Sequence, residues 1–492
     1  MDSQQFRQFG YAAIDYVAEY METIRDRPVL PEVEPGYLND KLPDEVPEKG
    51  EAWQKILQDF DQLIMPGVTH WQSPRFHAFF PTANSYPSIV GEILSAGLAV
   101  IGIHWTASPA CTELEVKVMN WLGKLLCLPH KFLNSSPGPG GGVIQSSASE
   151  STLICLLAAK AKSLRRVKKL HPHLDEQEIV SRLTAYTSDQ ANSSVEKSGM
   201  LGSVQLRILP ADENGELKRE ALIEAIKKDI ENGLFPCYMI ATLGSTGICT
   251  FDKLDVIGPI CQQYNIWLHV DAAYAGAAFI LPEYQHLMKG VEDASSFNFN
   301  PHKWLLVNFD CSALWVQDAN DLTDAFVVRR IYLEDKQENE NTQLPEYRNW
   351  QISLGRRFRA IKLWFTLRVY GKDGLQAFLR NHINLANLFA TLVEQDPRFE
   401  IVCPPRMGLV CFRIKGENQK TQKLHDLLME RKKVYMLTAS LNGKLFIRFV
   451  ICSRMMKESD VHFSWNEITS QTENILMNNG TLNGHSTNEI QE

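Results

Sequence analysis

The sequence predicts an α/β protein built on a large, mostly parallel sheet, with a smaller α+β domain toward the C-terminus. Two observations predict this fold class. Between about residues 76 and 375, short β-rich runs end in small or polar residues and lead into helical runs. Beyond residue 376, helix, strand, helix and strand follow one another. A chain of 492 residues is long enough for one large domain and smaller flanking ones.

The first expected element is an amphipathic helix over residues 3–25, because hydrophobic residues recur there at helical spacing. The next stretch, "RPVLPEVEPGYLNDKLPDEVPEKGE", is rich in proline and acidic residues and is expected to be an extended connector. A helix on such an arm has an apolar face to bury. It would pack either on its own body or on a second subunit.

The remaining elements define the expected domain boundaries. In the large domain, residues 76–375, "YMIATLGSTG" and "IWLHVDAAYAG" each predict a strand followed by a loop. In the small domain, residues 376–477, the strands "GLVCFRIKG" and "KLFIRFVIC" alternate with helices. Residues 1–75 form the N-terminal helical segment, and the polar residues 478–492 are expected to be disordered.

Composition excludes several classes of function. The net charge of −8 does not favour nucleic-acid binding. The ten cysteines form no CxxC pair and no zinc spacing, so reduced thiols and no metal site are expected. The N-terminus lacks the pattern of a signal peptide, and the most apolar stretch, residues 93–105, is too short to span a bilayer. The sequence therefore predicts a cytoplasmic protein without a membrane partner.

A glycine-rich stretch, "PGPGGG", leads into a serine cluster and a strong helix. Ser147 precedes Glu150 by three residues and fits a capping box, which puts Ser147, Ala148 and Ser149 at the helix N-terminus. Free N–H groups and the helix dipole make this a good anion site. The alternative is a plain capped helix after a glycine loop.

Two ionisable residues follow strands further along the chain. Asp271 comes after the apolar run "IWLHV", at the strand end where α/β sheets bind ligands, and a protonated pyridine would balance its charge. Lys303, in "FNPHKW", lies among apolar groups that would lower its pKa and favour a Schiff base. The alternatives are a turn-capping aspartate and a lysine that reaches the surface. A phosphate cradle, a strand-end aspartate and a downstream lysine are together what pyridoxal phosphate (PLP) requires.

Several longer motifs, among them "FFPTANSYPSIVGEILS", "SDQANSSVEKSG", "HVDAAYAG", "FNPHKW" and "LGRRFRAIKLWFTLRVYG", resemble the PLP-dependent group II decarboxylases, the aromatic L-amino acid decarboxylases of animals. The resemblance covers the chain to about residue 475. It implies the type I, aspartate aminotransferase-like PLP fold and a homodimer with shared active sites. It also implies that residues 1–75 serve dimerisation.

The resemblance implies a role for each matching residue. Lys303 would bind the PLP aldehyde, Asp271 would pair with the ring nitrogen, and His302 would lie beside the bound aldehyde. Other cofactor contacts are implied for Ser147, Ala148, Ser149, Asn192, Thr246 and Asn300. Substrate contacts are implied for Thr82, Phe79, Phe80, Asn192, Ile101, Ile103, Ser353 and Gly355. Ile101 and Ile103 would reach into the partner's pocket, and Tyr332 would lie on a mobile catalytic loop.

The chain departs from the family motif at Asn192. The family reads "SDQAHSS", and this chain reads "SDQANSS". The resemblance implies a histidine that stacks on PLP and organises proton delivery; an amide does not titrate near neutral pH and cannot relay a proton. Phe79, Ser353 and Ser146 also replace a usual tyrosine, proline and glycine.

These departures lead to a hypothesis about the reaction. If protonation after CO₂ loss is slow, O₂ can oxidise the substrate, and L-DOPA yields 3,4-dihydroxyphenylacetaldehyde, CO₂, ammonia and hydrogen peroxide. The insect 3,4-dihydroxyphenylacetaldehyde synthases, a group within this family, resemble this chain and carry asparagine at the position of Asn192. One alternative is an ordinary decarboxylase that makes dopamine, with Tyr332 or His302 as proton donor. A remote alternative is an inactive PLP-fold binding protein. Decarboxylation of histidine or glutamate is disfavoured by the overall match and by Gly355.

Overall fold

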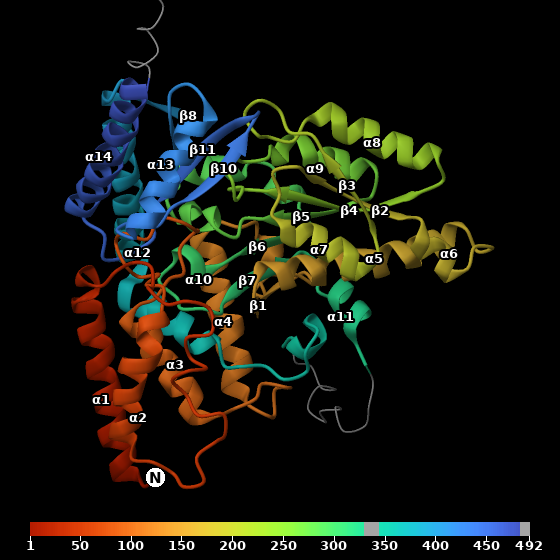
Figure 1. Ribbon diagram of the computed structural model, residues 1–492. Coiled ribbons are helices and arrows are strands. Elements are labelled where there is room, and N and C mark those ends of the chain that lie inside the picture. Colours follow the sequence, from red (N-terminus) through yellow and green to blue (C-terminus); the bar gives the residue numbers. More distant parts are fainter. Residues whose placement is uncertain (329–343, 483–492) are drawn as a thin grey trace, which may run out of the picture. The chain divides into compact units, whose positions relative to one another are not determined.

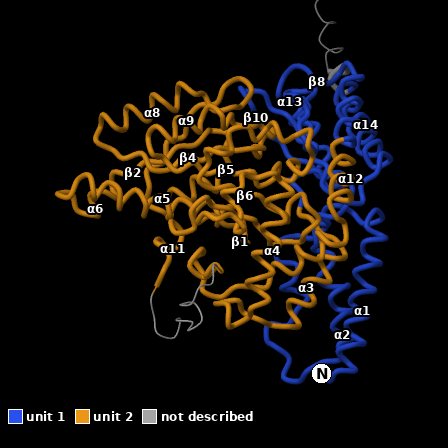
Figure 2. Tube along the Cα trace, turned by 180° about the vertical axis from the view of Figure 1, so that it is seen from behind, with its two compact units in different colours: residues 1–81, 384–492 blue, residues 82–383 orange. Residues whose placement is uncertain are grey.

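The computed structural model describes residues 1–328 and 344–482, which pack as two compact units. Unit 1 joins residues 1–81 with the chain from residue 384 onward, and unit 2 holds residues 82–383 (Figure 2). Unit 1 thus combines two segments that lie far apart in the sequence. The division into four consecutive segments that the sequence suggests stays a prediction.

Unit 2 is built on one sheet with the strand order β1-β7-β6-β5-β4-β2-β3 (Figure 1). Its strands are β1 (Gly141–Gln145), β2 (Leu183–Ser188), β3 (Gln205–Leu209), β4 (Phe235–Thr242), β5 (Trp267–Asp271), β6 (Ser296–Phe299) and β7 (Ser312–Val316). From β6 through β3 all neighbours pair in parallel, whereas β7 is antiparallel to both β1 and β6. The mostly parallel sheet expected from the sequence is confirmed, and Asp271 ends β5 as predicted.

Helices cover both faces of this sheet, which explains why β1, β2, β5, β6 and β7 are buried along their whole length. The helices are α3 (Tyr86–Leu98), α4 (Pro109–Leu125), α5 (Ala148–Leu170), α6 (Glu176–Ser181), α7 (Ser193–Gly202), α8 (Arg219–Glu231), α9 (Leu254–Gln263), α10 (Pro301–Trp304) and α11 (Asn320–Phe326). Helices α5 and α7 lie on one face, and α8 and α9 lie on the other (Figure 1). Right-handed crossovers place the helices in this way. The chain moves along the sheet toward β3 through α5 and α7, and then returns toward β4 and β5 through α8 and α9.

One long helix, α12 (Ala360–Gln395), contains a break at Gly371. Gly371 has φ 61° and ψ −179°, a conformation that residues with a side chain rarely adopt. The sequence predicts only the part of α12 from residue 375 onward.

Unit 1 contains a second, antiparallel sheet in the order β10-β11-β9-β8. Its strands are β8 (Phe399–Arg406), β9 (Leu409–Ile414), β10 (Leu437–Leu441) and β11 (Lys444–Val450). Its helices are α1 (Ser3–Glu22), α2 (Trp53–Asp59), α13 (Asn418–Arg431) and α14 (Glu458–Leu482), besides the end of α12. The sheet buries Val410, Phe412 and Phe449 against helices α12, α13 and α14.

Most elements expected in unit 1 are confirmed, with differences at their ends. Helix α1 stops at Glu22, three residues before the expected end. Helix α14 runs to Leu482, so its last turn overlaps the start of the tail for which disorder is predicted from residue 478, and that expectation stays a prediction. Apolar residues earlier in α14, such as Ile468 and Ile475, anchor the helix in the core. The rest of the predicted tail, 483–492, lies outside the described residues.

Short 3₁₀ helices and one short π-helix, η2, complete the description: η1 (Ile24–Asp26), η2 (Phe60–Ile64), η3 (Met65–Gly67), η4 (His130–Phe132), η5 (Ala275–Ile280), η6 (Pro282–Met288), η7 (Val291–Asp293) and η9 (Tyr347–Trp350). Among the described residues, no helix combines the length and the apolar composition needed to cross a membrane.

Candidate active site

The predicted site residues follow strands that end at one edge of the unit 2 sheet. Strand β7 is antiparallel to both β1 and β6, so β1 points in the same direction as β6, β5, β4 and β2. Their carboxyl ends therefore meet at one edge, the usual ligand-binding edge of an α/β sheet. Just beyond or at these ends lie Ser147, Asn192, Thr246, Asp271, Asn300 and Lys303.

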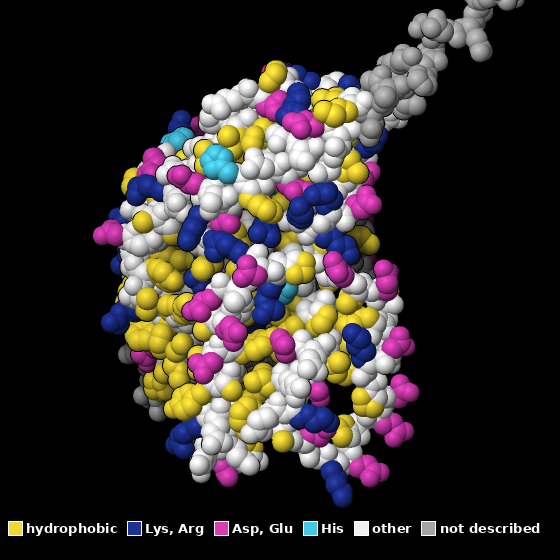
Figure 3. Space-filling view, turned by 60° about the vertical axis from the view of Figure 1, so that its left-hand side comes forward, with side chains coloured by type: hydrophobic (Ala, Val, Ile, Leu, Met, Phe, Trp, Pro, Cys, Tyr) yellow, Lys and Arg dark blue, Asp and Glu magenta, His cyan; other side chains and the backbone are white. Residues whose placement is uncertain are grey.

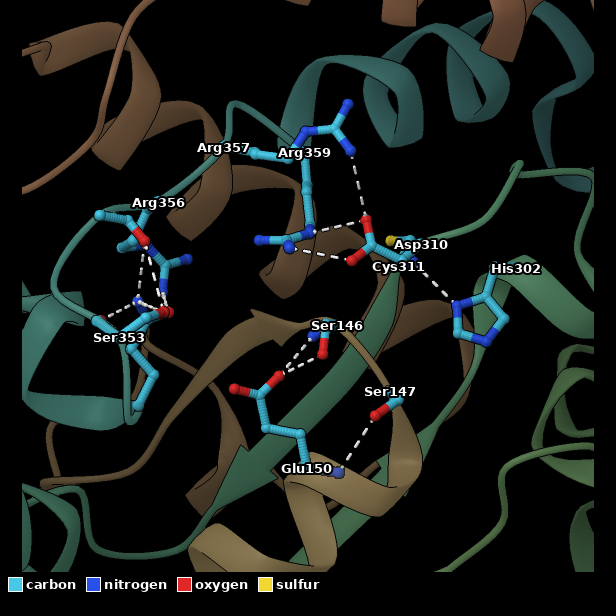
Figure 4. Close-up of polar contacts among 12 residues, drawn as sticks. Ser146, Ser147, Glu150, His302, Asp310, Cys311, Ser353, Arg356, Arg357 and Arg359 are labelled. Carbon is cyan, nitrogen blue, oxygen red and sulfur yellow. Dashed lines mark hydrogen bonds and ion pairs between the residues drawn. The ribbon is translucent and has the colours of Figure 1, made fainter. Parts of the chain in front are cut away.

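Helix α5 begins at this edge, directly after β1. The Ser147 hydroxyl accepts a hydrogen bond from the Glu150 N–H at 3.1 Å and so caps the helix. The Glu150 carboxylate accepts from the N–H of Ser146 at 3.1 Å and from its hydroxyl (Figure 4). The predicted cap is confirmed, but the return contact of the capping box is made by Ser146. The N–H groups of Ala148 and Ser149 have no partner within the helix, which favours an anion there.

Asp271 and Lys303 interact electrostatically. The Asp271 side chain is buried and accepts a hydrogen bond from the Ala273 N–H at 2.9 Å. Burial raises the pKa of Asp271, and the charge of Lys303 opposes this rise. Burial likewise lowers the pKa of Lys303, against the attraction of Asp271. The low lysine pKa agrees with the sequence-based expectation of a nucleophilic amine.

His302 precedes Lys303 in helix α10 and is 4% exposed. Its Nδ1 accepts the backbone N–H of Cys311 at 2.8 Å (Figure 4). Burial, followed by the charge of Lys303, lowers the pKa of His302 to about 3. Because a backbone N–H can only donate, the neutral ring carries its proton on Nε2 and acts as a hydrogen-bond donor.

Thr82 lies next to this helix. The N–H of the following residue, Ala83, donates to the carbonyl oxygen of His302 at 2.8 Å. The structure thereby brings the residue predicted to bind the substrate carboxylate beside the predicted lysine.

Asn192 forms two hydrogen bonds that the sequence analysis did not predict. Its Oδ1 accepts the N–H of Ser194 at 3.0 Å, so it is the N-cap of helix α7. Its Nδ2 donates to the Thr246 hydroxyl at 2.9 Å. Because the Ser194 N–H fixes which end of the amide is oxygen, the orientation is determined. Asparagine before a helix is a strong N-cap, and this signal could have been read from the sequence.

The segment that carries Ser353 and Gly355 is held by a buried ion pair, Arg356 with Glu115. Arg356 also donates to Gln351, whose Nε2 donates to the Ser353 hydroxyl at 3.1 Å (Figure 4). Sequence reasoning missed this pair, because two charges far apart in the chain give no local signal.

Ile101 lies against the same segment. A Cβ added at Gly355 would be 3.5 Å from Ile101 Cγ2, and the N–H of Gly102 donates to the Arg356 carbonyl at 3.0 Å. Ile103 follows, with its N–H bound to the Ile101 carbonyl. Ile101 is 56% exposed, so much of it remains available for another molecule.

Phe79 and Phe80 belong to unit 1, where Phe79 stacks on Trp71 at 5.2 Å between ring centres and Phe80 lies under the Arg448 guanidinium at 5.2 Å. Tyr332 lies outside the described residues.

A family model described as the pyridoxal-dependent decarboxylase conserved domain matches residues 35–415. The chain belongs to the pyridoxal-dependent decarboxylase family. It is 54% identical over 476 residues to the 3,4-dihydroxyphenylacetaldehyde synthase of Aedes aegypti, covering 97% of this chain and 91% of that protein. It is 53% identical over 475 residues to the aromatic-L-amino-acid decarboxylase of Drosophila melanogaster, covering 96% and 92%.

A solved relative has the same fold. The crystal structure of Oryza sativa TDC with PLP and tryptamine matches with a TM-score of 0.93 at 34% identity, covering 96% of this chain and 99% of that one. The present chain is therefore a PLP-dependent enzyme of the carboxy-lyase kind with the type I fold, as the sequence predicts.

The residues at the sheet edge fit PLP. The N-terminus of α5 suits a phosphate. Asn300 is 2% exposed, and its Oδ1 has no hydrogen-bond partner among the described residues, so this oxygen calls for a donor, while the amide nitrogen of the same side chain can donate to a phosphate. The buried carboxylate of Asp271 calls for a cation, which a protonated pyridine supplies.

Proposed function

We propose that the protein is a 3,4-dihydroxyphenylacetaldehyde synthase that acts on L-DOPA. One L-DOPA, one O₂ and one water would give one 3,4-dihydroxyphenylacetaldehyde, one CO₂, one ammonia and one hydrogen peroxide. The α-carbon loses two electrons beyond decarboxylation, and O₂ takes them up as peroxide. The observation that carries this proposal is the hydrogen-bonded amide of Asn192 where the family motif has an imidazole.

Each site residue receives a role in this proposal. Lys303 would bind the aldehyde of PLP, and Asp271 would keep the ring nitrogen protonated. Ser147, Ala148, Ser149 and Asn300 would hold the phosphate, and Thr246, bonded to Asn192, would lie beside the ring. When bound, PLP supplies the electron sink for cleavage of the bond between the α-carbon and the carboxylate.

The choice between amine and aldehyde depends on how fast a proton reaches the α-carbon. The amide of Asn192 cannot supply one, since it does not titrate near neutral pH. His302 is neutral, and its Nδ1 already accepts the Cys311 N–H, so it holds its single proton firmly on Nε2. Slow proton delivery from these residues favours oxidation by O₂.

A homodimer with shared active sites is part of the proposal. On helix α3, side chains that a monomer would bury are in the open: Val90, Ile93, Leu94 and Leu98 are 43–58% exposed, and Ile101 follows them. Exposed hydrophobic side chains also gather on the face drawn in Figure 3. Exposed apolar side chains of this kind support an interface with a second subunit. Ile101, Ile103, Ser353 and Gly355 would then contact the aromatic ring of the partner's substrate.

A second candidate is an aromatic amino acid decarboxylase that makes dopamine. It is favoured by the nearly equal identity to relatives of both kinds, 54% and 53%. Under this candidate, Tyr332 or His302 would deliver the proton in place of the missing imidazole.

One reaction distinguishes the candidates. Purified protein with PLP, L-DOPA and air is followed for O₂ uptake, peroxide, dopamine and aldehyde. Aldehyde and peroxide equal to CO₂, with little dopamine, are expected. Dopamine equal to CO₂ without O₂ uptake would establish the decarboxylase, and absence of the absorbance of lysine-bound PLP would indicate an inactive binding protein.

A further inference from the structure

Two cysteines lie opposite each other on adjacent strands of the unit 1 sheet. Cys403 on β8 and Cys411 on β9 are direct partners in an antiparallel pair. Direct partners in such a pair have Cα atoms about 4.5–5.5 Å apart. A disulfide requires a Cα separation of about 4.4–6.8 Å. The backbone is therefore already spaced for a bond between the two sulfur atoms.

A β-bulge creates this juxtaposition. Glu400 pairs with Arg413 and Ile401 pairs with Phe412, but the next pair is Cys403 with Cys411, so Val402 is an extra residue. Without it, Cys403 would pair with Val410, a core residue, and would point to the other face. Bulges re-aim side chains in this way.

The two thiols differ in access and contact each other. Cys411 is 1% exposed, whereas Cys403 is partly exposed. A hydrogen bond from Cys411 lowers the pKa of the Cys403 thiol. Burial raises this pKa, and the charge of nearby Arg406 lowers it further. By contrast, burial raises the pKa of Cys155 and Cys237 to about 12. Cys403 is therefore the thiol of the pair that a dissolved oxidant reaches more easily.

We propose that Cys403 and Cys411 form a peroxide-reactive dithiol that closes to a cross-strand disulfide. The Cys403 thiolate attacks peroxide: an S–O bond forms, the O–O bond breaks, and the released hydroxide takes up a proton as water. The Cys411 sulfur then attacks the Cys403 sulfur, the S–O bond breaks, and a second water leaves with the Cys411 proton. The two thiols lose two electrons in total, and peroxide gains them.

The dithiol is connected to a segment with predicted substrate contacts. Cys411 is also the partner of Arg448 on the neighbouring strand β11. Arg448 donates to the carbonyl of Ala78 at 2.9 Å and covers the ring of Phe80. Cys411 is therefore one strand away from the contacts that hold residues 78–80.

The oxidant is hydrogen peroxide, which the proposed aldehyde-forming reaction would release at the enzyme. The test adds peroxide as a reagent, without substrate. Its result is therefore independent of which reaction the enzyme catalyses.

The experiment uses the full-length enzyme with PLP, treated with a small molar excess of peroxide and then alkylated. Peptide mass spectrometry without reduction is expected to show the peptide that contains Cys403 linked to the peptide that contains Cys411. The linked mass should be two hydrogens below the sum of the two free peptides, and neither cysteine should be alkylated. Reduction should restore both thiols. Full alkylation of both cysteines after peroxide would overturn the proposal, as would Cys403 oxidised without a link.

Matched variants test the order of events. In Cys411→Ser, the sulfenic acid of Cys403 should persist and be trapped by dimedone, and no linked peptide should form. Cys127→Ser serves as the control, because Cys127 is an exposed cysteine outside the pair, and its loss should leave the linked peptide unchanged. Oxidation of Cys127 as fast as that of Cys403 in the wild type would overturn the proposed selectivity.

Discussion

Asn192 links two structural tasks in one short side chain, because its oxygen caps helix α7 and its nitrogen binds Thr246. Asn192→His is expected to raise the share of dopamine and lower peroxide, since an imidazole can relay a proton to the α-carbon. It should also cost about 1 kcal/mol of stability through the weaker cap. The ratio of dopamine to aldehyde, measured by chromatography, checks the first expectation.

Thr246→Val is the matched control for Asn192→His. It removes the hydroxyl that Asn192 binds and keeps the side-chain shape, but it adds no titrating group. The product should remain aldehyde. An unchanged ratio in Asn192→His would contradict the role given to Asn192 and would direct attention to Phe79 and Ser353.

At the residue scale, chemistry was easier to predict than contacts. The strand-end position of Asp271 and the helix-capping role of Ser147 could be predicted, because each follows from a local pattern. The bond between Asn192 and Thr246 could not, because the two residues meet only when β2 and β4 pair.

At the scale of elements, Glu115 of α4 joins two parts of the site. It binds Arg356 and also accepts the N–H of Ile144 on β1 at 2.8 Å. Glu115→Gln should destabilise the protein by about 3–5 kcal/mol, because it leaves a buried charge unpaired. It should also raise KM more than it lowers kcat, since the segment carrying Ser353 loosens. Urea unfolding and steady-state kinetics measure the two effects.

The double variant Glu115→Gln/Arg356→Met is the control for this prediction. Removing both charges should recover much of the lost stability. If the double variant is no more stable than Glu115→Gln, the ion pair is not the cause of the loss.

Helices and strands with a clear hydrophobic periodicity were predicted, whereas features that depend on pairing with residues far away in the sequence were not. The strands β4 and β5 and the helix α1 follow from their hydrophobic patterns. The bulge at Val402 did not, because only the pairing of β8 with β9 shows that one residue is extra. The break in α12 lies at Gly371, whose positive φ the sequence pattern did not predict.

For the whole molecule, buried histidines predict acid sensitivity. Burial lowers the pKa of His77 to about 4 and that of His269 to about 3, from an ordinary value of 6.5. Between these values the unfolded chain binds more protons, so stability is complete above pH 6.5 and is lost as the pH falls. At pH 5 each histidine should cost about 2 kcal/mol.

Urea midpoints measured from pH 7.5 to pH 5 check this expectation. His77 donates from Nδ1 to the Val450 carbonyl and contacts the Ser464 hydroxyl, both at 3.0 Å, and His77→Gln keeps hydrogen-bonding groups without titrating. The variant should show a shallower loss of stability toward acid. The same pH slope in the variant and the wild type would rule out the contribution of His77.

Unit 1 is closed by contacts between the two ends of the sequence, such as the ion pair of Arg25 with Asp460 at 3.0 Å. During translation, the first helices leave the ribosome long before the C-terminal part of unit 1, including Asp460, is synthesised. Unit 2, by contrast, is continuous and can fold while synthesis proceeds. Residues 1–81 remain without the rest of unit 1 while some three hundred further residues are synthesised, so we expect chaperones to bind them during this time. A chain truncated after residue 383 would contain a complete unit 2 but only the N-terminal part of unit 1, without the residues that part packs against.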